Sequence, residues 1–140
     1  MSSLFRSSFV FVFTLAGISP SALVYSQNDT DTSLIERATC DLRSLAIAIE
    51  LFQLDNLRVP TTEEGLQILV SGSSRQYLPQ VPTGPWGRAY QYVSPGQAGV
   101  KFDIFTLGAD GHVGGAGVDA DIRVKHDPER WRGTEPCARN

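Results

Sequence analysis

A long stretch with helical spacing of its apolar residues constrains the fold of this chain more than any other feature. These residues recur every three or four positions: Leu34, Ala38, Leu42, Leu45, Ile49 and Phe52. That spacing places them on one face of an α-helix, and no glycine or proline interrupts it before Asp55-Asn56. Ser33 and Glu36 match a capping box. The sequence therefore predicts an amphipathic helix over about 33–54 that packs along a sheet.

Two later segments show the alternation of apolar and polar residues that is typical of β-strands. They are Ala89–Val93 and Val100–Leu107, and a linker rich in turn-forming residues joins them. Such a pair predicts an antiparallel hairpin. Ile122–Lys125 is the candidate for a third strand.

The segment between the helix and the hairpin combines a helix cap with several prolines. Thr61 or Thr62 is placed to cap a short second helix that has acidic residues in its first turn. The prolines between Tyr77 and Gly87 predict an extended surface segment, because proline is excluded from central strands. Trp86 is the expected anchor of that segment on the core.

The segment Thr106–Ile122 combines many glycines with aspartates. Glycine lets the backbone fold back tightly, so the carboxylates of Asp110, Asp119 and Asp121 can converge. Converging carboxylates repel each other unless a cation lies between them, and hard oxygen ligands on a flexible loop suit Ca²⁺. From composition alone the segment is either a calcium site or a solvated surface loop.

The first residues have the organisation of an export signal. Arg6 precedes the apolar run Phe9–Ile18, and Val24-Tyr25-Ser26 offers a cleavage site before Gln27. The run is shorter than the roughly 20 apolar residues of a membrane span. We therefore expect a signal peptide over 1–26 and a periplasmic or secreted protein. The alternative is an uncleaved anchor that holds the protein in the inner membrane, facing the periplasm.

The remaining composition favours a disulfide and argues against several classes of function. Cys40 and Cys137 lie near opposite ends of the exported chain, where an oxidising compartment favours a disulfide over two free thiols. The net charge of −3 gives no support for a nucleic-acid partner. His112 and His126 have no evident catalytic partner in the sequence, and no nucleophile motif occurs. We therefore expect no enzyme.

A series of short motifs occurs in an order typical of one family. They are Asp55-Asn56, Pro60-Thr61-Thr62-Glu63, Gly65-Leu66, Tyr77-Leu78, Pro85-Trp86-Gly87, Tyr90-Gln91-Tyr92, Ser94-Pro95-Gly96 and Gly108-Ala109-Asp110-Gly111. Over about Leu42–Ile122 the chain resembles the globular part of the major (G-type) pseudopilin of type II secretion systems. The resemblance implies an α+β, pilin-like fold: a long N-terminal helix packed on a small antiparallel β-sheet with a calcium-binding loop. This globular domain is expected over 33–125, with a C-terminal tail over 126–140.

The resemblance also implies a set of calcium ligands. Asp110 matches the first carboxylate of the family's site and Asp121 the last. Many members have a further acid where this chain has Ala120, so either Asp119 replaces it or the site loses one ligand. The remaining expected ligands are the backbone carbonyls of Leu107, Ala109 and Val118.

The function implied by the resemblance is non-enzymatic. The expected protein belongs to, or is accessory to, a type II secretion system, with other pseudopilins or secretion-system components as partners. Three features depart from the family pattern: Ser8-Phe9 replaces the processing junction, no glutamate precedes Glu36, and Pro20 interrupts the apolar run. They favour an exported domain outside the filament, with membrane contact only if the N-terminal segment is uncleaved. The alternative is a free exported binding module that reuses the pseudopilin fold.

Overall fold

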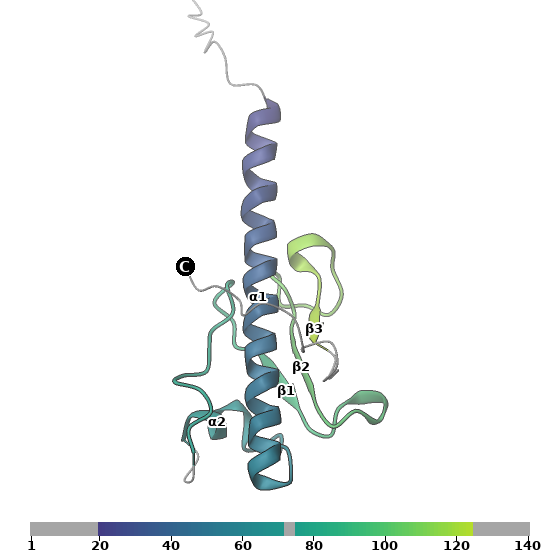
Figure 1. Cartoon of the computed structure of the whole chain (residues 1–140). Coiled ribbons are helices and arrows are strands. Elements are labelled where there is room, and N and C mark those ends of the chain that lie inside the picture. The colour runs from purple at the N-terminus through teal and green to yellow at the C-terminus, as the bar shows by residue number, and fades with distance from the viewer. Residues whose placement is uncertain (1–19, 72–74, 125–140) are drawn as a thin grey trace, which may run out of the picture.

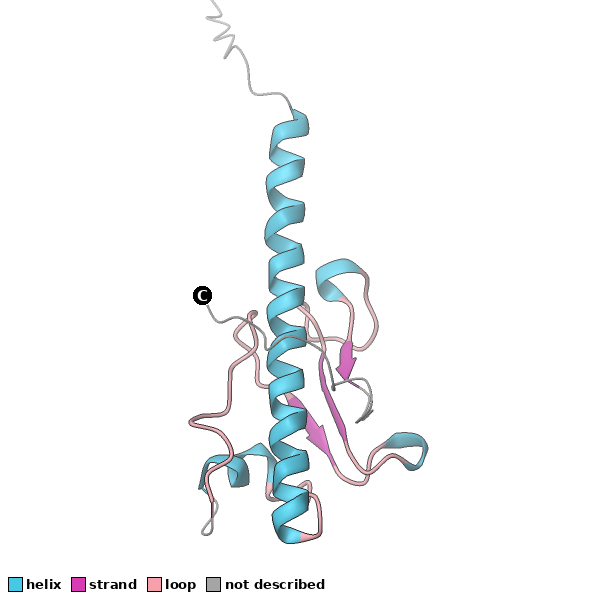
Figure 2. Ribbon diagram, in the orientation of Figure 1, coloured by secondary structure: helices cyan, strands magenta, loops and turns pink. Residues whose placement is uncertain are grey.

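The computed structural model describes residues 20–71 and 75–124. A single long helix, α1 (Pro20–Asn56), runs alongside a small sheet that packs against its C-terminal half (Figures 1 and 2). The other elements follow in the order η1 (Gly65–Gln67), α2 (Ile68–Ser71), β1 (Gln91–Val93), η2 (Gln97–Gly99), β2 (Asp103–Thr106), η3 (Gly117–Asp119) and β3 (Ile122–Val124). Cys137, His126 and the predicted tail over 126–140 lie outside the described residues, as does most of the predicted signal peptide.

The helix α1 begins at Pro20, and the prediction of a start near Ser33 was wrong. Ser33 is an interior residue of α1, where its Oγ donates to the carbonyl of Thr30 at 2.8 Å instead of capping the helix. Pro20, the first residue that the structure describes, is part of α1. Within the described residues, no helix is both long and apolar enough to cross a membrane.

The sheet confirms the predicted hairpin and third strand. Its strands are antiparallel in the order β1-β2-β3. In the register, Ile104 of the central strand pairs with Tyr92 on one side and with Val124 on the other. The strands are shorter than the alternating segments of the sequence. The core of the sheet therefore depends on packing against α1 as well as on strand pairing.

The face of α1 predicted from the apolar spacing is the buried face from Ala38 to Phe52. Leu42, Leu45 and Ile49 have no exposed surface, and the central strand contributes Ile104, which is also fully buried. Burial of each such side chain stabilises the fold by about 1.5–3 kcal/mol. This packing positions β2, and with it the start of the loop that leads to β3.

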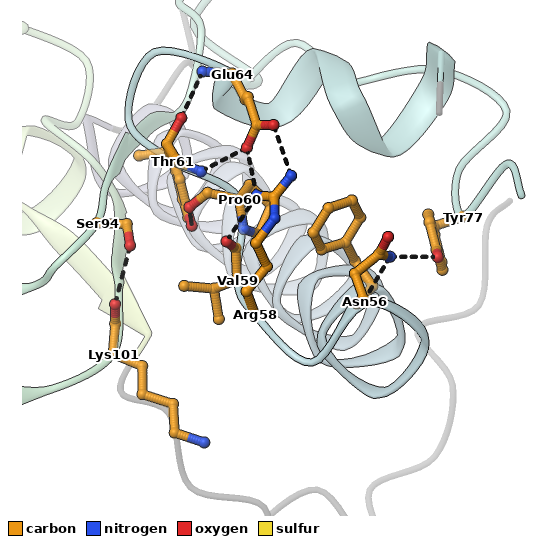
Figure 3. A network of polar contacts seen from close by, with 11 residues as sticks. Asn56, Arg58, Val59, Pro60, Thr61, Glu64, Tyr77, Ser94 and Lys101 are labelled. Carbon is orange, nitrogen blue, oxygen red and sulfur yellow. Dashed lines mark hydrogen bonds and ion pairs between the residues drawn. The ribbon is translucent and has the colours of Figure 1, made fainter. Parts of the chain in front are cut away.

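The predicted short second helix corresponds to η1 and α2, and the segment from Arg75 to Tyr90 is irregular, as its prolines predict. Thr61 and Glu64 exchange the two hydrogen bonds of a capping box across the turn that precedes η1 (Figure 3). Partly buried Tyr77, Leu78 and Val81 hold the segment against the core. These contacts take the place of the predicted anchor, Trp86, which is half-buried.

Candidate metal centre

The glycine loop, Leu107–Asp121, leaves the central strand and returns as β3. It lies beside α1, which contacts the short helix η3 within the loop (Figure 1). Backbone hydrogen bonds close it: the N–H of Ala109 donates to the Val118 carbonyl at 2.8 Å, and that of Asp121 to the Gly114 carbonyl at 3.1 Å. The pairing of Thr106 with Ile122, which flank the loop, brings its two ends together.

Two glycines allow the halves of the loop to touch. Gly108 has a φ of +63°, and a Cβ built on it would lie 2.6 Å from the carbonyl carbon of Asp119. A Cβ on Gly115 would lie 2.3 Å from the Asp119 carbonyl oxygen. Any larger residue would push the backbone of Asp119 away, so these glycines are required for the close approach.

The predicted carboxylate ligands occupy different surroundings. Asp110 is exposed. Its Oδ1 accepts a hydrogen bond of 2.9 Å from the N–H of His112, so the Asp110 side chain caps the turn formed by residues 110–112. Asp119 and Asp121 are half-buried. In the part of the chain that the structure describes, no group of three or more acidic, histidine or cysteine side chains is arranged to hold a metal ion. The structure therefore does not gather the three aspartates into one cluster, and the calcium assignment stays a prediction.

One atom of the loop fits a cation. Asp121 Oδ1 is buried and has no hydrogen-bond partner among the described residues. A buried carboxylate oxygen in this state is costly unless a charge or donor satisfies it. The carbonyls of Leu107 and Val118 each accept a backbone hydrogen bond and keep a second lone pair for a ligand. These candidate ligands, a carboxylate oxygen and two carbonyl oxygens, are all hard oxygen ligands, so the chemistry of the loop fits Ca²⁺.

Arg88 is the residue of this region that sequence reasoning missed. Its Nη1 donates to the carbonyls of Ala109 and, at 3.4 Å, Gly108, and its Nη2 donates to the Asp110 carbonyl at 3.2 Å. The carbonyl of Ala109, a predicted metal ligand, therefore accepts a hydrogen bond from a guanidinium. No spacing rule links residue 88 to the loop, because the contact arises only when the segment before β1 folds beside it.

Comparison with known protein sequences identifies one family. The family model described as type II secretion system (T2SS), protein G, matches residues 26–125. Type II secretion system core protein G of Vibrio cholerae is 42% identical over 96 residues, which cover 62% of this chain and 65% of that protein. The protein of the same name from Pseudomonas aeruginosa is 39% identical over 102 residues, covering 66% and 71%. The chain thus spans slightly less than two thirds of the length of the Vibrio relative.

A solved structure gives the same result for the fold. The crystal structure of the major pseudopilin from the type 2 secretion system of enterohaemorrhagic Escherichia coli superposes with a TM-score of 0.56 at 31% identity. The match covers 77% of this chain and 96% of that one. It confirms the predicted pilin-like arrangement of a long helix on a small antiparallel sheet.

Proposed function

The chain belongs to the type II secretion system protein G family, and on that premise we propose that it is a non-enzymatic, pseudopilin-like component of a type II secretion system. The observation that carries the proposal is the family match over residues 26–125, supported by the fold shared with a solved major pseudopilin. In this role the protein acts through contacts with other pseudopilins or secretion-system components, on the periplasmic side of the inner membrane.

The polar side chains of the described region support a structural role. The Tyr90 hydroxyl donates to Asp41 of α1 at 2.9 Å, and the Tyr92 hydroxyl donates to the carbonyl of Pro60 at 2.7 Å. Both bonds join the hairpin region to segments far away in the chain. Side chains used in this way position elements of the fold, and no catalytic role is part of the proposal.

A structural Ca²⁺ in the glycine loop is the second part of the proposal. The buried Oδ1 of Asp121, which has no hydrogen-bond partner among the described residues, supports it, together with the strand pairing that brings the two ends of the loop near each other. Asp119 and Asp121 would supply carboxylates, with Asp119 in place of the acid absent at Ala120, and Asp110 would complete the set. Bound there, the ion would neutralise carboxylates that otherwise repel each other. The carbonyls of Leu107 and Val118 would add further oxygens.

The experiment that tests the role in secretion is deletion of this chain in its own organism. We expect substrates of the type II system to accumulate in the periplasm, and the wild-type chain supplied in trans to restore their export. Site-specific crosslinks from the surface of α1 should reach other pseudopilins. Normal export together with no such crosslink would favour the alternative, a free exported binding module that reuses the fold.

The N-terminal sequence of the mature protein tests where it resides. A new N-terminus at Gln27 supports the predicted signal peptide and a periplasmic or secreted protein. Retention of the upstream residues in a membrane fraction supports the anchored alternative. Both outcomes are compatible with a role in secretion, so this measurement is independent of the deletion experiment.

A further inference from the structure

Three consecutive backbone carbonyls of the glycine loop point toward one side chain. They belong to Gly108, Ala109 and Asp110, and each accepts a hydrogen bond from the guanidinium of Arg88. Successive carbonyls of an extended chain point in alternating directions, so they converge only where the backbone turns sharply. The positive φ angles of Gly108 (+63°) and Gly111 (+72°) make that turn. Converging carbonyl oxygens are a typical feature of a cation site.

From this geometry we infer that Arg88 is a built-in cation of the glycine loop, which holds the first half of the loop folded without a bound metal. A guanidinium suits the role because it is always charged and presents several N–H donors in a fixed plane. The turn over residues 107–112 also has internal hydrogen bonds. The N–H of Gly111 donates to the Leu107 carbonyl at 3.1 Å, and the N–H of His112 donates to Asp110 Oδ1.

The loop backbone packs directly on the guanidinium at Gly111. A Cβ at this position would lie 2.6 Å from Nε and 2.9 Å from Cζ of Arg88. These atoms belong to the rigid guanidinium plane, so any larger residue at 111 would displace the group from the carbonyls. Gly111 therefore serves two purposes, the turn itself and the close approach of Arg88.

The two halves of the glycine loop are held by different groups. Arg88 holds the carbonyls of residues 108–110, whereas Asp121 Oδ1, which no described residue contacts through a hydrogen bond, lies in the second half. The first half should consequently stay folded in a metal chelator. Because this holds whether or not the loop also binds calcium, the test is made in chelator alone and is independent of the calcium proposal.

The test is amide hydrogen exchange of the full chain, measured by NMR in chelator, for wild type and Arg88→Gln. We expect the amides of Gly111 and His112 to be protected in the wild type and to lose roughly tenfold or more of that protection in the variant, the factor that corresponds to about 1.4 kcal/mol. Arg88→Lys should restore part of it, because lysine keeps the charge but not the planar fork. The control is Arg75→Gln, which removes an exposed arginine that pairs with Asp55. Equal protection in wild type and Arg88→Gln would overturn the inference.

Two alanine variants of loop glycines, one in contact with Arg88 and one not, test the same contact by changing the loop instead of the arginine. Gly111 and Gly117 have similar φ angles of +72° and +61°, but a Cβ on Gly117 would meet nothing within 4 Å. Alanine at either position causes similar backbone strain. The loss of amide protection in Gly111→Ala beyond that in Gly117→Ala therefore measures the contact with Arg88. We expect that excess to vanish in the Arg88→Gln background, since neighbouring groups show coupled effects. An excess that persists there, or an equal loss in both variants, would contradict the inference.

Discussion

Arg58 and Glu64 form a two-pronged ion pair, with Nη1–Oε2 at 2.7 Å and Nη2–Oε1 at 2.8 Å. Glu64 Oε2 also accepts the N–H of Thr61 at 2.8 Å, and Thr61 Oγ1 accepts the N–H of Glu64 in return (Figure 3). Arg58 lies 5.3 Å from the ring centre of Phe52. A single carboxylate thus joins the end of α1 to the turn that starts η1.

Glu64 should make the stability of the protein sensitive to acid. The hydrogen bonds from Arg58 and the Thr61 backbone lower the pKa of Glu64 from 4.5 to about 2. The folded protein therefore binds this proton less readily than the unfolded chain, so the stabilisation is present above pH 4.5 and is lost as the pH falls toward 2. Urea unfolding followed by circular dichroism should show a shallower acid limb for Glu64→Gln. Glu63→Gln, at an exposed neighbour, is the control, and matching acid slopes in wild type and Glu64→Gln would contradict the prediction.

Tyr92 should contribute to stability in the alkaline range. Burial raises its pKa from 10.0 to about 12, and its hydroxyl donates to the fully buried Pro60. The folded state keeps this proton more tightly than the unfolded chain, so the contribution is complete below pH 10 and is lost as the pH rises through 12. Tyr92→Phe should cost about 1 kcal/mol at neutral pH and flatten the alkaline limb. If the free energy of unfolding, measured in urea, falls equally between pH 10 and 12 in wild type and Tyr92→Phe, the predicted contribution of Tyr92 is wrong.

Two leucines of α1 offer a matched test of its buried face. Leu42 is fully buried, whereas Leu54 is 73% exposed. Leu42→Ala should lower the free energy of unfolding by about 2–5 kcal/mol, because it leaves a cavity between the helix and the sheet. Leu54→Ala, with the same chemical change, should stay within about 0.5 kcal/mol of wild type. If urea unfolding shows the same loss of unfolding free energy in both variants, the assignment of Leu42 to the buried face of α1 is wrong.

Calcium should raise the melting temperature. An ion that binds only the folded state stabilises it by RT ln(1 + [L]/Kd). Asp110→Ala or Asp121→Asn should remove the rise, and Asp119→Ala tests whether that residue replaces the acid missing at Ala120. Differential scanning calorimetry in calcium and in chelator measures the effect, with Asp29→Asn on the exposed surface of α1 as control. Identical melting curves in both solutions would rule out the site.

The predicted disulfide between Cys40 and Cys137 would close most of the exported chain into one loop. Thiol alkylation of the unreduced protein should then modify no cysteine. Reduction should destabilise the fold, by roughly 4–5 kcal/mol at most in the chain-entropy model. Mass spectrometry after alkylation reads the first outcome directly, and labelling of both residues without reductant would exclude the bridge.

Periodic patterns in the sequence by themselves determined the main elements. The apolar spacing from Ala38 to Phe52 predicted the buried face of α1, and alternation predicted β1 and β2, with Ile122–Lys125 as the candidate for β3. These predictions succeed because a helix or strand has a fixed periodicity, so residues at that spacing in the sequence lie on one face of the element. The same reasoning misplaced the start of α1, because the polar residues before Leu34 have no helical periodicity although they lie within the helix.

Only the tertiary structure decided which distant groups meet. Arg88 contacts carbonyls about twenty residues away in the chain, and Tyr90 pairs with Asp41 at a separation of 49. Such partners depend on how whole segments pack, which no local spacing encodes. In the glycine loop the sequence located the acids and the required glycines, while the fold determined that a guanidinium holds its first half and that Asp121 Oδ1 is buried in the second. Side-chain chemistry is readable residue by residue, but its geometry exists only after the chain has packed.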